Sequence, residues 1–220
     1  MKKFEYTPPE QPRELILKLG QKITDRIGHT VTAEDPEYYG LEALVTDEMA
    51  EVALKMKVRK PMTLAQVVKA TGKEEKVLEE LLQEMSNIGL LEYNWENPKH
   101  EKQYVLPMYV PGSAEFFNMK LDQIKEHPEV ASFFERMAFL PLQKVTPMVP
   151  PGGAGIGMHV IPVEKAIETE NESVSVEHIS HWLDKYDGKY AAGPCSCRYS
   201  RGVLGEGCAD DPEDWCIGVG

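Results

Sequence analysis

The sequence predicts an α+β protein that is mainly helical. Apolar residues recur at spacings of three and four in several segments, which is the pattern of amphipathic helices. Two short runs, LLEYNW and KQYVLP, flank the turn-rich segment ENPKHE and predict a β-hairpin. All four cysteines of the 220 residues lie in the last 26, which predicts a cysteine-rich metal-binding part at that end.

Residues 1–43 form the first predicted unit, a helical lead-in. Its helix covers residues 10–28, because apolar residues there lie three and four positions apart. The residues on this apolar face are Leu15, Ile16, Leu19, Ile23 and Ile27. Residues 29–43 contain Pro36 and Gly40 among acidic residues, so they predict a connector with a short turn of helix.

Residues 44–110 predict a second unit, which begins with two short helices. The first begins at a capping residue, either Thr46 or Asp47. The second is capped by Thr63 and ends at Gly72, since glycine readily adopts the left-handed conformation that terminates helices.

A longer helix over residues 74–88 follows and ends at Gly89. Its predicted apolar face consists of Val77, Leu78, Leu81, Leu82, Met85 and Ile88. The hairpin comes next along the chain. The order helix, helix, helix, hairpin is typical of a winged helix-turn-helix.

The charge of the chain indicates whether such a unit binds nucleic acid or protein. The chain carries 24 Lys and Arg against 36 Asp and Glu, and its net charge of −12 repels phosphate backbones and anionic lipid surfaces. A DNA-binding unit would place its third helix in the major groove. Here that helix carries the acidic residues Glu74, Glu75, Glu79, Glu80 and Glu84. We therefore expect protein contacts rather than nucleic acid, with the basic hairpin residues Lys99, His100 and Lys102 keeping DNA as the alternative.

Residues 111–220 predict a helical domain that ends in the cysteine motif. Ser113 caps a helix to about Glu126, and Pro128 begins a second helix to about residue 138. Residues 140–163 are rich in proline and glycine and predict a long irregular loop. Ser175 caps the last predicted helix.

The cysteines have the spacing C-x-C-x10-C-x7-C. They are Cys195, Cys197, Cys208 and Cys216. Disulfide frameworks belong to small secreted domains, and the N-terminus MKKFEYTPPE has no apolar signal core, so metal ligation is the better explanation. Four soft thiolates in a loop-rich, glycine-containing segment are suitable ligands for a metal ion or cluster.

The spacing alone leaves the metal open between zinc and iron–sulfur. Common zinc loops begin with C-x2-4-C, and common ferredoxin loops with C-x2-C-x2-C, and neither spacing is present. If Cys195 and Cys197 lie on extended backbone, they are about 6.6 Å apart on one face. That separation suits two irons of a cluster better than one ion.

The segment CSCRYSRGVLGEGCADDPEDWCIGVG resembles a motif of anaerobe iron–sulfur proteins, C-x-C-R, then G-C, then P-x-x-x-C-x-x-x-G. In that family the module stands in front of ferredoxin-type or pyridine nucleotide-disulfide-type oxidoreductase domains. The matching residues are Cys195, Cys197, Arg198, Gly207, Cys208, Pro212, Glu213, Cys216 and Gly220. The resemblance implies a 4Fe-4S cluster held by all four thiolates, in an electron-transfer component with a flavin-type or ferredoxin-type redox partner.

On that hypothesis Arg198 places positive charge near an anionic cluster and raises its reduction potential. The alternative for Arg198 is a salt bridge to Asp210, Asp211 or Asp214. A zinc-stabilised interaction module and a metal-sensing winged-helix regulator remain the competing functions.

The remaining sequence contains no recognisable nucleophile elbow, P-loop or flavin site. We therefore expect a non-catalytic electron-transfer portion of an oxidoreductase. Because the chain stops directly after the apolar residues CIGVG, we expect it to be the front part of a longer flavin- or NAD(P)-dependent enzyme. No stretch approaches the roughly 20 apolar residues of a membrane span, so the expected location is the cytoplasm. The resemblance of the cysteine motif implies an anaerobic organism.

Overall fold

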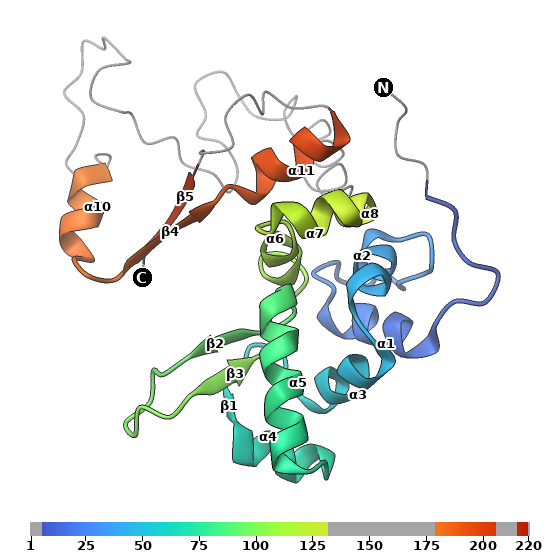
Figure 1. The fold of residues 1–220 in the computed structure, drawn as a ribbon, viewed down its shortest axis with the longest axis horizontal. Helices are drawn as coiled ribbons and strands as arrows, with labels where there is room; N and C mark the ends of the chain where they lie inside the picture. Colours follow the sequence, from blue (N-terminus) through green and yellow to red (C-terminus); the bar gives the residue numbers. More distant parts are fainter. Residues whose placement is uncertain (1–5, 132–178, 206–214, 220) are drawn as a thin grey trace.

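The computed structural model describes residues 6–131, 179–205 and 215–219. About half of these residues are helical, and the strands form two small antiparallel sheets (Figure 1). The protein is therefore mixed α/β with a large helical share, as the sequence predicts.

The lead-in contains two helices, α1 (Glu14–Ile23) and α2 (Pro36–Leu44). Helix α1 buries Ile16, Leu19 and Ile23, as predicted, but it is shorter than residues 10–28. Thr24 leaves the helical conformation with ψ 140°. The prediction for Ile27 is wrong, because this side chain lies beyond the helix end and is fully exposed.

The predicted connector at residues 29–43 is also wrong in part, because it contains the nine-residue α2. Pro36 stands in the first helical turn, where its missing N–H removes no helical hydrogen bond. The Tyr109 hydroxyl donates to the Pro36 carbonyl at 2.9 Å and occupies the space beside Gly40. Long-range packing therefore stabilises a helix that the local composition disfavours.

A buried charge network joins the end of α1 to the start of α2. Glu37 is completely buried, and its carboxylate accepts hydrogen bonds from Arg26 at 2.6 and 2.8 Å. The Thr24 hydroxyl donates to the same carboxylate at 2.9 Å. Arg26 also binds Asp35 at 2.7 Å, and His29 contacts that carboxylate at 3.0 Å.

The next elements are α3 (Asp47–Lys55), β1 (Met62–Thr63), α4 (Leu64–Thr71) and α5 (Glu75–Ile88). The Thr46 hydroxyl caps α3 by accepting the Met49 N–H at 3.2 Å, which resolves the predicted alternatives. Thr63 forms a capping box with Gln66, as expected of a helix start.

Both glycines predicted to end helices do so. Gly72 ends α4 with φ 71°, and Gly89 ends α5 with φ 96°. Helix α5 buries Leu78, Leu81, Leu82 and Met85. Val77 is an exception to the predicted apolar face, because half of its surface is exposed in the first turn of the helix.

The predicted hairpin consists of β2 (Glu92–Asn94) and β3 (Gln103–Val105). Strand β3 lies between β1 and β2, and both pairings are antiparallel. Tyr104 of β3 lies opposite Met62 of β1 and Tyr93 of β2.

Three short helices follow, α6 (Ser113–Phe117), α7 (Leu121–Glu126) and α8 (Pro128–Ala131). The single helix predicted from Ser113 to Glu126 is therefore wrong. The buried Asn118 amide donates to the Ala114 carbonyl at 2.8 Å and to the Val130 carbonyl at 3.2 Å, which holds the chain in a bend after α6.

Gly112, not Ser113, occupies the capping position of α6, and its N–H donates to the Glu115 carboxylate at 2.8 Å. Pro128 begins α8, as predicted. The predicted continuation of this helix beyond Ala131, the loop at 140–163 and the Ser175 cap lie outside the described residues.

The C-terminal elements are α10 (Ile179–Lys185), β4 (Tyr190–Pro194), α11 (Ser196–Leu204) and β5 (Trp215–Val219). Helix α11 packs on α6, α7 and α8, and the β4–β5 pair extends away from it (Figure 1). One hydrophobic cluster includes residues from Ile16 to Val130, with Tyr199 and Val203 of α11 packed against it. The division at residues 43 and 110 into separate units stays a prediction.

Within the described residues, none of the helices is long and apolar enough to cross a bilayer.

Candidate metal centre

Cys195 and Cys197 lie at the amino end of α11. Cys195 follows β4 directly and occupies the N-cap position with extended backbone, φ −76° and ψ 106°. Cys197 is the second residue of the helix. Backbone N–H groups at a helix start carry partial positive charge, which favours anionic groups such as thiolates.

Strand β5, which follows α11 in the chain, places Cys216 near the amino end of α11. In the antiparallel β4–β5 pair, Cys216 lies opposite Gly193 and Trp215 lies opposite Pro194. Gly193 is only two residues before Cys195. Three of the four predicted ligands therefore lie in the region where β4 ends and α11 begins.

The pKa values of Cys197 and Cys216 are both raised, in part by neighbouring cysteines. The pKa of Cys216 is raised to about 11 by partial desolvation, by the Cys195 side chain and by the charge of Cys197. A hydrogen bond from the Ser196 N–H lowers this pKa in part. Partial desolvation and Cys195 likewise raise the pKa of Cys197. A bound cation would oppose this effect, because it favours the deprotonated, negatively charged form of each sulfur.

The described part of the chain does not by itself complete a metal site. It contains no group of three or more His, Cys, Asp or Glu side chains placed to hold a metal ion. Cys208, the fourth predicted ligand, lies outside the described residues. Cys195, Cys197 and Cys216 lie near one another, but the described residues do not place them as a metal-binding group.

Two predictions about this segment are wrong. The segment is not loop-rich throughout, because residues 196–204 form α11, with Gly202 inside the helix. Cys195 and Cys197 therefore do not share one extended stretch, since the helix begins between them. Their separation is therefore not the roughly 6.6 Å expected of an extended stretch.

Helix α11 is anchored on the rest of the protein by its buried face. Ser196 and Ser200 are buried, and the Ser200 hydroxyl donates to the Cys197 carbonyl at 3.1 Å. Tyr199 and Val203 pack against the main hydrophobic cluster. The positions of Cys195 and Cys197 thus depend on the same core that holds the other helices.

The strand before α11 also lies close to the helical body. A Cβ atom added to Gly193 would be 3.3 Å from the terminal methyl carbon of Met119. Glu115 of α6 is near enough for its charge to contribute to the raised pKa of Cys197, after desolvation and Cys195. The candidate metal centre therefore lies beside α6.

Arg198 is the residue after Cys197 and lies exposed in the first turn of α11. This position keeps its predicted charge close to the cysteines. The aspartates of the alternative salt bridge, Asp210, Asp211 and Asp214, lie outside the described residues, so both interpretations of Arg198 stay predictions.

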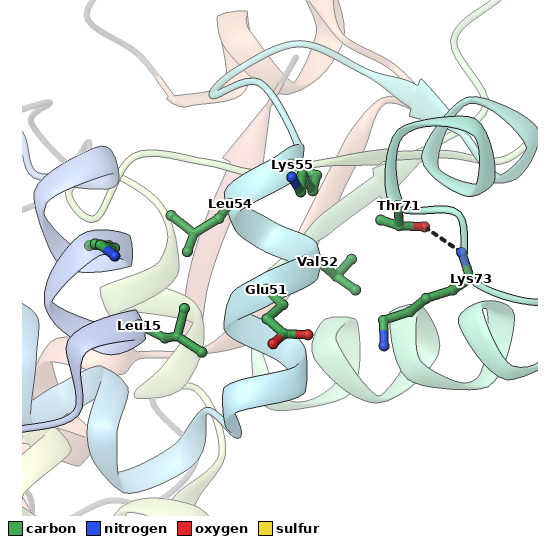
Figure 2. Close-up of a pocket in the computed structure, with 8 residues that line it drawn as sticks. Leu15, Glu51, Val52, Leu54, Lys55, Thr71 and Lys73 are labelled. Atoms are coloured by element: carbon green, nitrogen blue, oxygen red, sulfur yellow. Dashed lines mark hydrogen bonds between the residues drawn. The ribbon is translucent and has the colours of Figure 1, made fainter.

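A separate pocket of about 420 Å³ lies between α1, α3 and the turn from α4 to α5. Figure 2 shows Lys73 extending from this turn toward α3. The lining residues are Leu15, Lys18, Glu51, Val52, Leu54, Lys55, Thr71 and Lys73. None of these eight residues is a cysteine or a histidine. Two of the lysines are engaged, Lys18 with Glu14 at 2.6 Å and Lys73 with Glu48 at 2.7 Å.

Sequence reasoning missed the β4–β5 pair and α11. The segment YAAGP lacks the alternation of apolar and polar residues that identifies a strand. Cysteine is not a usual N-cap residue, and Gly202 argues against a helix interior. Gly205, with φ 69° at the C-cap, is the one local signal that marks the end of α11.

Comparisons of the chain with protein-family models, with curated proteins and with solved structures gave no match.

Proposed function

We propose that Cys195, Cys197, Cys208 and Cys216 bind one iron–sulfur cluster, of the 4Fe-4S type, and that the protein is an electron-transfer module of an oxidoreductase. The observation that carries this proposal is that Cys195 and Cys197 lie at the start of α11 and that β5 places Cys216 opposite Gly193, two residues before Cys195. The resemblance of the cysteine motif to anaerobe iron–sulfur modules favours a cluster over a single ion.

The chain's own residues have distinct tasks in this proposal. The Ser196 N–H interacts with the Cys216 sulfur and stabilises its negative charge. The contacts of Tyr199 and Val203 keep the helix start in place. When bound, the cluster would accept and release one electron at a time.

Anaerobic purification of the full chain tests the proposal directly. The expected protein is coloured, contains iron and acid-labile sulfide at about four of each per chain, and is bleached by dithionite. Cys195→Ser and Cys216→Ser should each lose most of the colour and iron, whereas Ser180→Ala in α10 should retain both. A protein without bound iron would overturn the cluster.

A zinc-stabilised interaction module is the second candidate. The Cys195 side chain interacts with the sulfurs of both Cys197 and Cys216, and this compact arrangement suits a single ion. A colourless protein that contains one zinc per chain, lost in the same two cysteine variants, would establish this candidate in place of the cluster.

A metal-sensing winged-helix regulator is supported by the order of elements between Asp47 and Val105. Strand β1 lies between α3 and α4, the hairpin follows α5, and β3 is the central strand. We propose that these elements form a winged helix-turn-helix. A regulatory role requires DNA affinity that falls steeply with salt concentration.

A further inference from the structure

Helix α5 and the β2–β3 hairpin enclose a groove of about 450 Å³. Its helix side carries Glu79, Glu80 and Glu84, all of which are exposed. Its hairpin side is formed by Tyr104 and Lys102. Three carboxylates on one wall make this groove locally acidic, although Lys76 and Lys102 also line it.

Two large, half-exposed aromatic side chains lie on the hairpin, one of them paired across the sheet with the groove residue Tyr104. Tyr93 lies opposite Tyr104 in the sheet, and about half of its surface is exposed. Trp95 is also half exposed, and its ring contacts Tyr93 edge to face at 5.5 Å between centroids. Exposed aromatic pairs beside a charged groove are typical of interaction surfaces.

The position of Lys102 shows that this surface accommodates a positively charged group. Its ammonium nitrogen lies 4.5 Å from the Tyr93 ring centroid and 5.0 Å from that of Tyr104. It also donates a hydrogen bond to the Gln83 side chain of α5 at 2.9 Å. A cation is therefore already held between aromatic rings and the polar face of α5, an arrangement that cation–π attraction stabilises.

We propose that the wing groove, defined by Glu79, Glu80 and Glu84 of α5 with Tyr93 and Trp95 of the hairpin, binds a Lys/Arg-rich segment of a partner protein. The carboxylates complement the positive charges of such a segment, and Trp95 offers a ring for a guanidinium or ammonium group. The same carboxylates repel a phosphate backbone, which favours a basic peptide over nucleic acid in this groove. The inference does not depend on which metal the cysteines bind.

Peptide binding to the full chain tests this proposal. The probe is a fluorescently labelled decapeptide of alternating arginine and alanine, and its counterpart with glutamate in place of arginine is the peptide control. The triple variant E79Q/E80Q/E84Q should weaken binding by about tenfold, because each exposed ion pair contributes modestly. Trp95→Ala should weaken it by about threefold.

A matched variant separates the groove from the overall acidity of the protein. E10Q/E34Q/E51Q removes the same three charges at exposed sites elsewhere and should leave the affinity within about twofold. Equal weakening by the two triple variants would overturn the proposal, since it would show that only the net charge matters. Binding of a short DNA duplex that Trp95→Ala abolishes would also overturn it, because the surface would then serve nucleic acid.

Discussion

Cys216 lies directly opposite Gly193 in the β4–β5 pair, and Gly193 lies against the end of the Met119 side chain. Strand β4, which pairs with the Cys216 strand β5, therefore passes close to the helical body. A glycine at this position lets the strand approach without displacing Met119. The location of the candidate metal centre depends on this close approach.

Gly193→Val should reduce the metal content of the purified protein. The added side chain would push β4 away from Met119, because a Cβ at this position is already at 3.3 Å from its methyl carbon. The double variant Gly193→Val/Met119→Ala opens the required space and should recover metal content. Metal analysis of both proteins checks this, and equal losses in the two would show that the contact is irrelevant.

Gly89→Ala should destabilise the protein much more than Gly72→Ala. Both glycines have left-handed backbone conformations, which cost an alanine about 1 kcal/mol. At Gly89 an added Cβ would also lie within 2.9 Å of the Phe116 and Phe117 backbone, whereas nothing lies within 4 Å at Gly72. We expect a loss of about 3 kcal/mol or more at Gly89 in urea unfolding. Similar losses at both positions would contradict this.

Arg26→Ala should lower the free energy of unfolding by about 3–5 kcal/mol, because it leaves the buried Glu37 carboxylate without its charged partner. Lys18→Ala is the control, since the Lys18–Glu14 pair is exposed and should cost at most about 0.5 kcal/mol. Arg26→Lys keeps the charge but not the two-nitrogen contact, so its effect should be intermediate. Thermal and urea unfolding measure all three variants.

The contribution of Asp35 to stability should disappear in acid. Burial alone would raise the pKa of Asp35, but hydrogen bonds from the Thr32 backbone, Arg26 and His29 hold this pKa well below its usual range. Its contribution is therefore complete above the unfolded-state pKa of about 4 and is lost as the pH falls toward the folded-state value.

Unfolding of wild type and Asp35→Asn between about pH 7 and pH 2 checks this expectation. The difference in unfolding free energy between them should be constant near neutral pH and should narrow below about pH 4. A difference that stays constant throughout the acid range would mean that Asp35 has an ordinary pKa.

Arg198→Ala should lower the reduction potential of the loaded cluster by on the order of tens of millivolts, because it removes a positive charge close to the ligands. Arg198→Lys keeps the charge and should retain most of the potential. A redox titration of the three proteins gives the answer. An unchanged potential combined with reduced stability in Arg198→Ala would instead support the salt bridge to the neighbouring aspartates.

Local signals predicted the middle of the chain well. Thr46 and Thr63 cap helices as expected, and Gly72 and Gly89 end them. These signals work because hydrogen bonding at a helix end involves residues only three or four positions away. The hairpin was predictable for the same reason, since its two strands lie close together in sequence.

Elements that depend on distant residues were not predictable from sequence patterns. Helix α2 contains Pro36 and Gly40 and is supported by Tyr109 from far along the chain. The bend after α6 depends on the Asn118 amide reaching the Val130 carbonyl. At the candidate metal centre, the cysteine motif predicts the ligands but not the strand pairing that places Cys216 opposite Gly193.

The packing of Tyr199 and Val203 against the main core has a thermodynamic consequence. Helix α11 cannot leave its place without exposing apolar surface, so unfolding of the core and release of a group bound at its amino end are linked equilibria. Any group that binds the folded helix start more tightly than the unfolded chain must raise the melting temperature in proportion to the logarithm of its free concentration. The melting temperature of the whole protein would then measure how fully the cysteines are occupied.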